Sequence, residues 1–213
     1  MSPASLPHLR CSLPRRKPRI SLLLTAVLLA SLAGFGCASH TFDGAHRASH
    51  DRLTAAGEYT VYIDLNSDRG NATNTQVGDY GSREAILAPP FDQWLSNGLR
   101  SEFRRAGFRV SDTPGPGPEP VHVKVQVIQV FSERAANCAP FADCTGGVAS
   151  FDVEITDPRS GDRFLRRFVG TSSDTTTSSS VDDLEDRIRE SVSDAYLQIV
   201  TETHALLTAP PGN

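Results

Sequence analysis

The chain has little of several residue types, and each shortage excludes a class of protein. Its 213 residues include one tryptophan, one methionine and four cysteines, and aromatic residues make up 7% of the chain. This length and composition fit one globular domain with appendages. The net charge is −4 and the basic residues do not gather in one cluster, so the sequence lacks the positive field that nucleic-acid binding needs. We therefore expect no nucleic-acid partner.

The short signatures of catalysis are also missing. The sequence has no glycine-rich phosphate loop, no serine nucleophile elbow and no pair of acids beside a histidine. Asp64, Asp68 and Arg69, near the end of an expected strand, are the best candidates for holding a substrate, but such residues commonly form turns and salt bridges. We predict that the protein is not an enzyme, that it has no catalytic residues, and that it uses no cofactor or metal.

One long apolar run is present, and a cysteine ends it. The stretch LLLTAVLLASLAGFGCASH begins at Leu22, and the basic leader RRKPRI precedes it. The apolar segment has about 17 residues, just enough for a membrane-spanning helix, so a transmembrane anchor is the competing interpretation. The small residues around Cys37 and the lack of a basic cluster after it favour a secretory signal.

This junction resembles a bacterial lipoprotein signal, in which a peptidase cuts after a small residue and the following cysteine carries lipid. Gly36 matches the small residue and Cys37 the lipid attachment site, whereas Gly34 and Phe35 depart from the usual aliphatic and small residues. The resemblance implies a signal peptide at residues 1–36.

After the lipidated cysteine we expect a flexible tether, together residues 37–57. The segment is polar, and it carries His40, His46 and His50. His46 and His50 would share one face of a helix and could bind a metal. A solvated linker with incidental histidines is the simpler interpretation.

The two cysteines in CAPFADC, Cys138 and Cys144, are predicted to form a disulfide. Export would bring the chain into an oxidising compartment, where Cys11 has left with the signal and Cys37 is acylated. Zinc binding is the competing interpretation, but no second close cysteine pair and no convergent histidines accompany these two.

The predicted disulfide closes a projecting loop from Ser132 to Gly147. Pro140 and Phe141 lie midway between its two cysteines, and a short covalent ring leaves little room for Phe141 to reach the core. We predict that Phe141 and Pro140 bind a partner. The alternative is that Phe141 folds back and covers a neighbouring sheet edge.

The remaining residues predict one α/β (α+β) domain over 58–207, followed by a disordered tail at 208–213. YTVYIDL is typical of a strand, and the polar stretch from Asn66 to Glu84 is typical of a loop. Apolar residues at helical spacing predict one helix from Pro90 to Gly107 and a second of about 27 residues from Val181, capped by Ser180. Three more strands are expected, at Val121–Phe131, Val148–Thr156 and Arg163–Gly170.

These elements predict a mixed, mainly antiparallel sheet of four to five strands with both helices on one face. The core should form where the helices meet the sheet. The expected core residues are Leu95, Leu99, Phe103, Ile188, Val192 and Ile199 on the helices, and Val123, Val125, Phe151 and Val153 on the strands.

Four stretches occur in an order that resembles the YajG-like lipoproteins: VYIDLNSDRG, VGDY, LRSEFRRAGFRV and VHVKVQVIQV. The resemblance covers Tyr59 to Leu206, and CAPFADC lies outside its pattern. In that family an Asp and an Arg end the first strand, a Gly-Phe pair closes a helix, and a valine-rich strand follows. The matching residues here are Asp68, Arg69, Gly107, Phe108 and Val121–Val127. The resemblance implies an outer-membrane lipoprotein that faces the periplasm.

These features predict a lipid-anchored envelope protein of a Gram-negative bacterium, attached to the periplasmic face of the outer membrane. We expect a non-catalytic binding or assembly factor whose partners are the membrane, through the N-terminal lipid, and other envelope proteins. The alternative is a small-ligand or glycan-binding module, and an enzyme comes third. The oligomeric state is not predicted.

Overall fold

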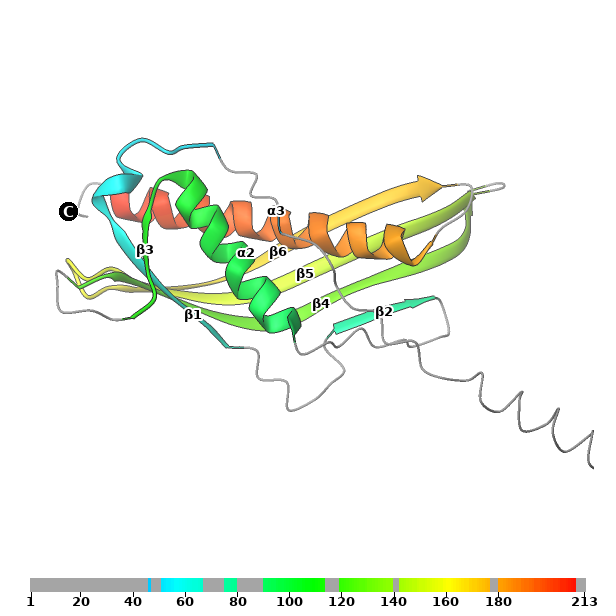
Figure 1. The fold of residues 1–213 in the computed structure, drawn as a ribbon, viewed down its shortest axis with the longest axis horizontal. Coiled ribbons are helices and arrows are strands. Elements are labelled where there is room, and N and C mark those ends of the chain that lie inside the picture. The colour runs from blue at the N-terminus through cyan, green and yellow to red at the C-terminus, as the bar shows by residue number, and fades with distance from the viewer. Residues whose placement is uncertain are drawn as a thin grey trace, which may run out of the picture. The chain divides into compact units, whose positions relative to one another are not determined.

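The computed structural model describes residue 46 and residues 51–66, 75–79, 90–113, 119–139, 142–176 and 180–209. Residues from Ser39 onward form one compact unit, in which six described strands make one sheet and two long helices pack on it (Figure 1). The predicted signal peptide and Cys37 lie outside the described residues.

The first three strands of the chain are short and the last three are long. In order they are the short 3-10 helix η1 (Ala56–Glu58), β1 (Thr60–Asn66), β2 (Thr75–Asp79), α2 (Pro90–Ala106), β3 (Arg109–Ser111), β4 (Val121–Ala139), β5 (Ala142–Thr156), β6 (Arg163–Thr176) and α3 (Val181–Thr208). The predicted mixed sheet with two helices is confirmed.

The sheet has the order β3-β1-β4-β5-β6, and β2 also pairs with β4. Strand β1 is parallel to β3 and to the first half of β4, whereas β2 is parallel to the second half of β4. Because β5 occupies the other edge of β4, strands β1 and β2 follow one another along the same edge. The β4–β5 and β5–β6 ladders are antiparallel and are the longest in the sheet.

Two regions that the sequence predicted as loops contain strands. The predicted loop Ser132–Gly147 is wrong, because β4 continues to Ala139 and β5 begins at Ala142, so the two strands form one long hairpin. The predicted loop Asn66–Glu84 contains β2. Both stretches are poor in β-branched and aromatic residues, so pairing with long neighbouring strands determines their conformation rather than local propensity.

A bulge in β4 changes which residues face the helices. In the first part of β4 the odd-numbered Val121, Val123 and Val125 are buried and Val127 is half-buried, and the pairing with β5 then skips Ile128. Beyond it, the even-numbered Val130 and Ser132 are buried. The extra residue Ile128 therefore shifts the alternation by one, so that even-numbered residues face the helices in the rest of β4.

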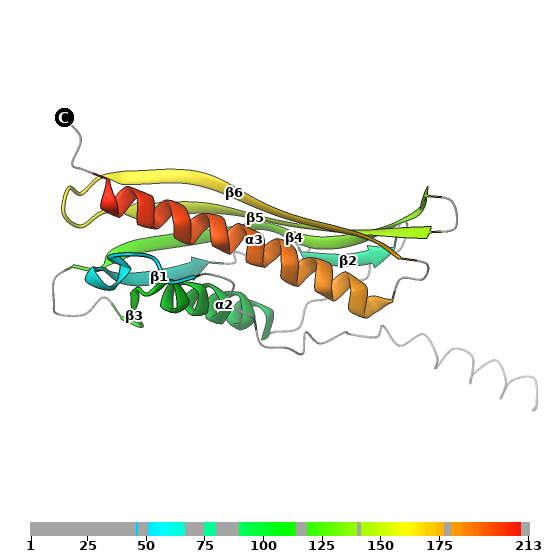
Figure 2. The same ribbon diagram turned by 90° about the horizontal axis from the view of Figure 1, so that it is seen from above.

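The core lies between one face of the sheet and the two helices. Tyr196 on α3 donates a hydrogen bond to the carbonyl oxygen of Leu95 on α2 (2.8 Å), so the two helices pack on each other as well as on the sheet. Figure 2 shows α3 running along β4, β5 and β6, with α2 beside β1. All ten predicted core residues are buried, which confirms both helix faces: Leu95, Leu99, Phe103, Ile188, Val192, Ile199, Val123, Val125, Phe151 and Val153.

Helix α3 begins with the predicted capping box. The Ser180 hydroxyl accepts a hydrogen bond from the backbone N–H of Asp183, and the Asp183 carboxylate accepts one from the backbone N–H of Ser180. These contacts with Ser180 hold the pKa of Asp183 below its usual value. No helix in the described ranges is long and apolar enough to span a membrane.

Part of the predicted tether packs on the domain. The Leu53 N–H donates a hydrogen bond to the carbonyl oxygen of Ala106 (2.8 Å), and Ala56 is completely buried. The side chain of His46 is buried as well. A solvated linker is therefore the wrong interpretation for these residues, because apolar and hydrogen-bonding contacts hold them against α2 and its C-terminal end.

Two glycines let the backbone of α3 touch the sheet. A Cβ atom at Gly147 on β5 would overlap the carbonyl oxygen of Arg187 and lie 2.7 Å from its carbonyl carbon. At Gly170 on β6 it would overlap the carbonyl oxygen of Ser191 and lie 3.0 Å from the Cβ of Ala195. Because these helix residues are four apart, one line of the α3 backbone rests directly on two strands.

We predict that Gly147→Ala lowers the free energy of unfolding by about 1–3 kcal/mol or more, because the added methyl group forces α3 away from β5. Gly146→Ala is the matched control, since its Cβ would lie 3.8 Å from the nearest atom, the carbonyl oxygen of Ser172. Urea unfolding of both variants measures the difference. Equal loss of stability in the two variants would contradict the close approach of α3.

Candidate functional site

The face of the sheet that the helices leave uncovered is the candidate functional site. We call it the open face. Its side chains alternate with the buried ones along β1, β4, β5 and β6, and most are polar or charged. The open face comprises Tyr62, Asp64, His122, Lys124, Gln126, Asp152, Glu154, Arg163, Leu165, Arg167 and Val169.

Strand register arranges these side chains in rows across the sheet. In one row Asp64, Lys124 and Glu154 lie opposite one another on β1, β4 and β5, so negative and positive charges alternate. In the next row Asp152 on β5 lies opposite Arg167 on β6. Directly opposed residues of opposite charge attract one another. The open face is therefore a surface of alternating charge with no excess of one sign.

The best-formed ion pair of this surface joins Asp152 and Arg167. The Arg167 guanidinium donates two hydrogen bonds to the Asp152 carboxylate, of 2.7 and 2.8 Å. These hydrogen bonds hold the pKa of Asp152 below its usual value and raise that of Arg167. Arg163 and Glu154 form a looser pair at 3.3 Å. Because these pairs are exposed to solvent, they fix side-chain positions more than they stabilise the fold.

Aromatic and apolar side chains lie at the two sides of the charged rows. The rings of Tyr62 and His122 are 5.2 Å apart, and the Nε2 atom of His122 is buried without a hydrogen-bond partner in the described structure. On β6, at the sheet edge, Leu165 is 75% exposed and Val169 is 43% exposed. A binding surface with polar rows and exposed apolar groups suits recognition of a partner.

Helix α3 occupies part of the β6 edge. The backbone N–H of Thr171 donates a hydrogen bond to Asp194, and Gln198 donates one to the carbonyl oxygen of Val169 (3.2 and 3.1 Å). Backbone groups at a free sheet edge would otherwise be available to another strand. The edge is thus closed by side chains in the middle of β6.

At the hairpin end of the sheet, Cys138 and Cys144 form a disulfide with Cα atoms 5.9 Å apart. The bond links β4 and β5 near the tip of their hairpin. The predicted partner-binding residues, Pro140 and Phe141, lie outside the described residues, so their role stays a prediction. The hairpin itself is longer and more regular than the predicted loop.

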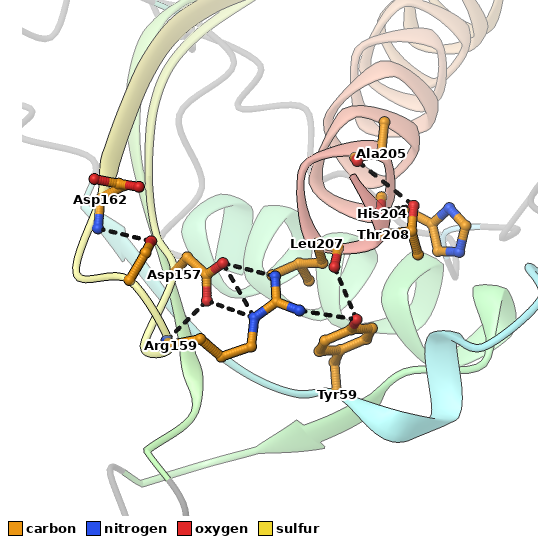
Figure 3. A network of polar contacts seen from close by, with 9 residues as sticks. Tyr59, Asp157, Arg159, Asp162, His204, Ala205, Leu207 and Thr208 are labelled. Carbon is orange, nitrogen blue, oxygen red and sulfur yellow. Dashed lines mark hydrogen bonds and ion pairs between the residues drawn. The ribbon is translucent and has the colours of Figure 1, made fainter. Parts of the chain in front are cut away.

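At the opposite end, a polar network holds the β5–β6 turn (Figure 3). The Arg159 guanidinium donates hydrogen bonds to both carboxylate oxygens of Asp157, the shortest 2.7 Å, and one of 3.3 Å to the Tyr59 hydroxyl. That hydroxyl donates to the carbonyl oxygen of Leu207 near the end of α3 (2.8 Å). The turn, the start of β1 and the end of α3 are thereby linked. The network is structural, because its members are engaged with one another.

Within the described ranges, no group of three or more His, Cys, Asp or Glu side chains is placed to hold a metal ion. Of the candidate substrate ligands, Asp64 lies on the open face, whereas Asp68 and Arg69 are outside the described residues. The sequence predicted Val123 and Val125 as the core side of their strand, but it missed the ion pairs between β5 and β6 on the opposite face, because these depend on register.

Comparison with known proteins supports the fold. No family model and no curated protein sequence matches the chain. A solved protein from Xanthomonas campestris, described by the family model DUF330, matches with a TM-score of 0.54 and 11% identity, over 77% of this chain and 94% of its own. At this identity the similarity shows a shared fold alone.

Two solved bacterial lipoproteins match with lower scores. Rare lipoprotein B from Shewanella oneidensis has a TM-score of 0.37 and 10% identity, over 70% of this chain and 99% of its own. A lipoprotein from Neisseria meningitidis has a TM-score of 0.31 and 6% identity, over 71% and 99%. Similarity at this level carries no conclusion about a shared function.

We predict that Asp157→Asn lowers the free energy of unfolding by about 1 kcal/mol at pH 7, because Arg159 is half exposed and the pair is partly screened. Hydrogen bonds from Arg159 hold the pKa of Asp157 below its usual value. The stabilisation is therefore present above the unfolded-state pKa of about 3.9 and is lost as the pH falls through the lower folded-state pKa.

Chemical denaturation between pH 7 and pH 2 measures this effect. Asp162→Asn, in the same turn, is the control for the loss of one charge. The difference between wild type and Asp157→Asn should disappear at the lowest pH. A difference that stays constant at all pH values would contradict the role of the Asp157 charge.

Proposed function

We propose that the protein is a lipid-anchored, periplasm-facing envelope protein that binds or helps to assemble other envelope components without catalysis. The observation that carries this proposal is the open face, where charged rows and exposed apolar side chains lie on a sheet that the helices leave uncovered. The apolar run that ends at Cys37 supplies the anchor. The disulfide between Cys138 and Cys144 fits an oxidising compartment.

The open face suits a protein partner because its fixed charges and its exposed apolar side chain can distinguish one partner from another. Exposed ion pairs such as Asp152–Arg167 add little to folding stability, yet they present fixed charges to a partner. Leu165 is a large apolar side chain next to these charges, the arrangement found where an apolar anchor is surrounded by polar contacts. A partner with complementary rows of charge would pair with the surface in one register.

Glycan binding is the second candidate, and the Tyr62–His122 ring pair is the observation that favours it. Aromatic faces stack on apolar faces of sugar rings, and the buried Nε2 atom of His122 makes no hydrogen bond in the described structure. Asp64 and Gln126 lie on the same face and would accept and donate hydrogen bonds to hydroxyl groups.

We also propose that the chain is related to the YajG-like lipoproteins and is attached to the outer membrane. Three of the stretches that carry the resemblance form β1, the end of α2 with Gly107 and Phe108, and β4. Ala38 rather than Asp follows Cys37, which favours the outer membrane under the enterobacterial sorting rule that the resemblance suggests. Density-gradient fractionation tests the location, and recovery in the inner membrane would refute it.

The lipid anchor predicts that cells incorporate radiolabelled palmitate into the native chain and not into Cys37→Ser, because the thiol of Cys37 is the attachment point. Cys138→Ser is the control, since this thiol is in the disulfide and should leave labelling unchanged. Equal labelling of native protein and Cys37→Ser would refute the lipoprotein assignment.

The partner surface predicts that a photo-crosslinking residue at Gln126, exposed on the open face, forms a protein adduct in intact cells. The same residue at Arg104, exposed on α2, is the matched control and should form none. Lys124→Gln should weaken the Gln126 adduct because it removes one charge of the row, while the melting temperature changes by only about a degree or two. Adducts of equal yield at both positions, or an adduct that Lys124→Gln leaves unchanged, would contradict this use of the open face.

A further inference from the structure

The segment between the lipid anchor and the domain places one side chain in the protein interior. His46 follows Cys37 by nine residues, and its side chain is 4% exposed. Its Nε2 atom lies 2.8 Å from the Oε1 atom of Glu102, whose own side chain is fully buried on α2. A buried carboxylate requires hydrogen-bonding partners, and His46 is one of the partners of Glu102. A linker residue thus takes part in the polar contacts of the protein interior.

Both helices contribute to the site that holds His46. Trp94, Gly98 and Glu102 are spaced by four residues on α2 and therefore share one face of the helix. The His46 ring meets Trp94 edge-on, with centroids 6.1 Å apart, and lies 5.6 Å from the ring of Tyr196 on α3. We call this the imidazole site, formed by Trp94, Gly98, Glu102 and Tyr196.

Gly98 makes room for the imidazole. A Cβ atom at this position would lie 3.1 Å from the Cγ of His46 and 3.2 Å from the Cε2 of Tyr196. Tyr196 has no freedom to move aside, because it is fully buried and its hydroxyl is bonded to Leu95. Even a methyl group would therefore crowd the imidazole and require it to shift by a few tenths of an ångström, so the site fits the ring closely.

The acidic side chain at the imidazole site also favours the His46 ring as its occupant. Burial, with a contribution from the charge of Glu102, raises the pKa of the Tyr196 hydroxyl well above its usual value, so this hydroxyl stays neutral. Glu102 is the acidic group at the site, and the His46 ring supplies a hydrogen bond to it. A side chain with a planar ring and an N–H donor satisfies both the shape and the chemistry of the site.

A second attachment lies further along the chain. The Leu53 N–H donates a hydrogen bond to the carbonyl oxygen of Ala106. The carbonyl oxygen of Thr54 accepts one from the His204 ring on α3 (2.6 Å). Residues from Leu53 onward are thus held at the end of α2 independently of His46. Residues from Leu53 onward therefore stay attached to the domain when the His46 contact is lost.

We propose that His46 is a latch that docks the anchor segment in the imidazole site and fixes how far the domain can stand from the membrane. The distance argument rests on the proposed lipid at Cys37. With His46 docked, nine residue steps span at most about 30 Å, whereas sixteen steps to Leu53 span about 55 Å. The latch therefore roughly halves the maximum reach of the tether and limits how far the open face can stand from the membrane.

Hydrogen exchange on the full-length protein in phosphatidylethanolamine vesicles tests the docking. Amides around His46 should exchange at least about tenfold faster in His46→Ala and in Gly98→Leu, whose side chain would take the space of the ring while His46 and Glu102 are both retained in the sequence. His46→Gln should restore slow exchange, because its amide N–H₂ can donate to Glu102. His40→Ala, in the same segment, is the control.

Exchange in β4 and β5 shows whether each variant is folded. If His46→Ala unfolds the domain, Gly98→Leu and His46→Gln still decide the question. Unchanged exchange around residue 46 in a folded Gly98→Leu variant would overturn the latch. Equal exchange in His46→Gln and His46→Ala would overturn the hydrogen bond to Glu102 as its basis.

Energy transfer from a dye at Arg104→Cys to labelled lipid headgroups tests the height of the domain. Transfer should fall in His46→Ala and remain unchanged in His40→Ala. Loss of all transfer in Cys37→Ser supports the anchor. If the exchange results hold but Cys37→Ser associates with vesicles as the wild type does, the lipid anchor fails and the docking of His46 stands.

Discussion

The direct contact between the backbone of α3 and the sheet is the constraint on which the rest of the structure depends. At Gly147 and Gly170 the strands carry no side chain, so the helix approaches more closely than side-chain packing allows. This fixes the position of α3 along β5 and β6. It places Asp194 and Gln198 beside the β6 edge and Tyr196 against α2. A shift of the helix would disturb the core, the sheet edge and the imidazole site together.

Because both helices lie on one face, the other face of the sheet must be compatible with water. Register solves this by placing opposite charges next to one another, as in Asp152 with Arg167 and Glu154 with Arg163. The fold can therefore keep an uncovered sheet without a continuous apolar surface. The same arrangement leaves Leu165 as an exposed apolar group among fixed charges. The face covered by the helices thus provides the core that stabilises the fold, and the open face provides the side chains proposed for recognition.

Sequence patterns predicted the parts of the fold that local periodicity determines. Leu95, Leu99 and Phe103 defined α2, and the Ser180–Asp183 cap defined the start of α3. The hairpin beyond Ser132 was missed because its residues have low strand propensity and are held by pairing with distant strands. The open-face ion pairs were missed because they depend on register, which periodicity leaves undetermined. His46 was missed because a single histidine in a polar segment carries no sign of its distant partner, Glu102.

The order of elements along the chain has a consequence for folding. Strands β4, β5 and β6 and helix α3 are consecutive, so they can assemble through contacts between neighbouring segments. Strand β1 instead pairs with β3 and β4, which come much later in the chain, and both pairings are parallel. Closing such long loops slows folding, so the C-terminal half should form first and provide the template. The first strand to be synthesised is then among the last to find its neighbours.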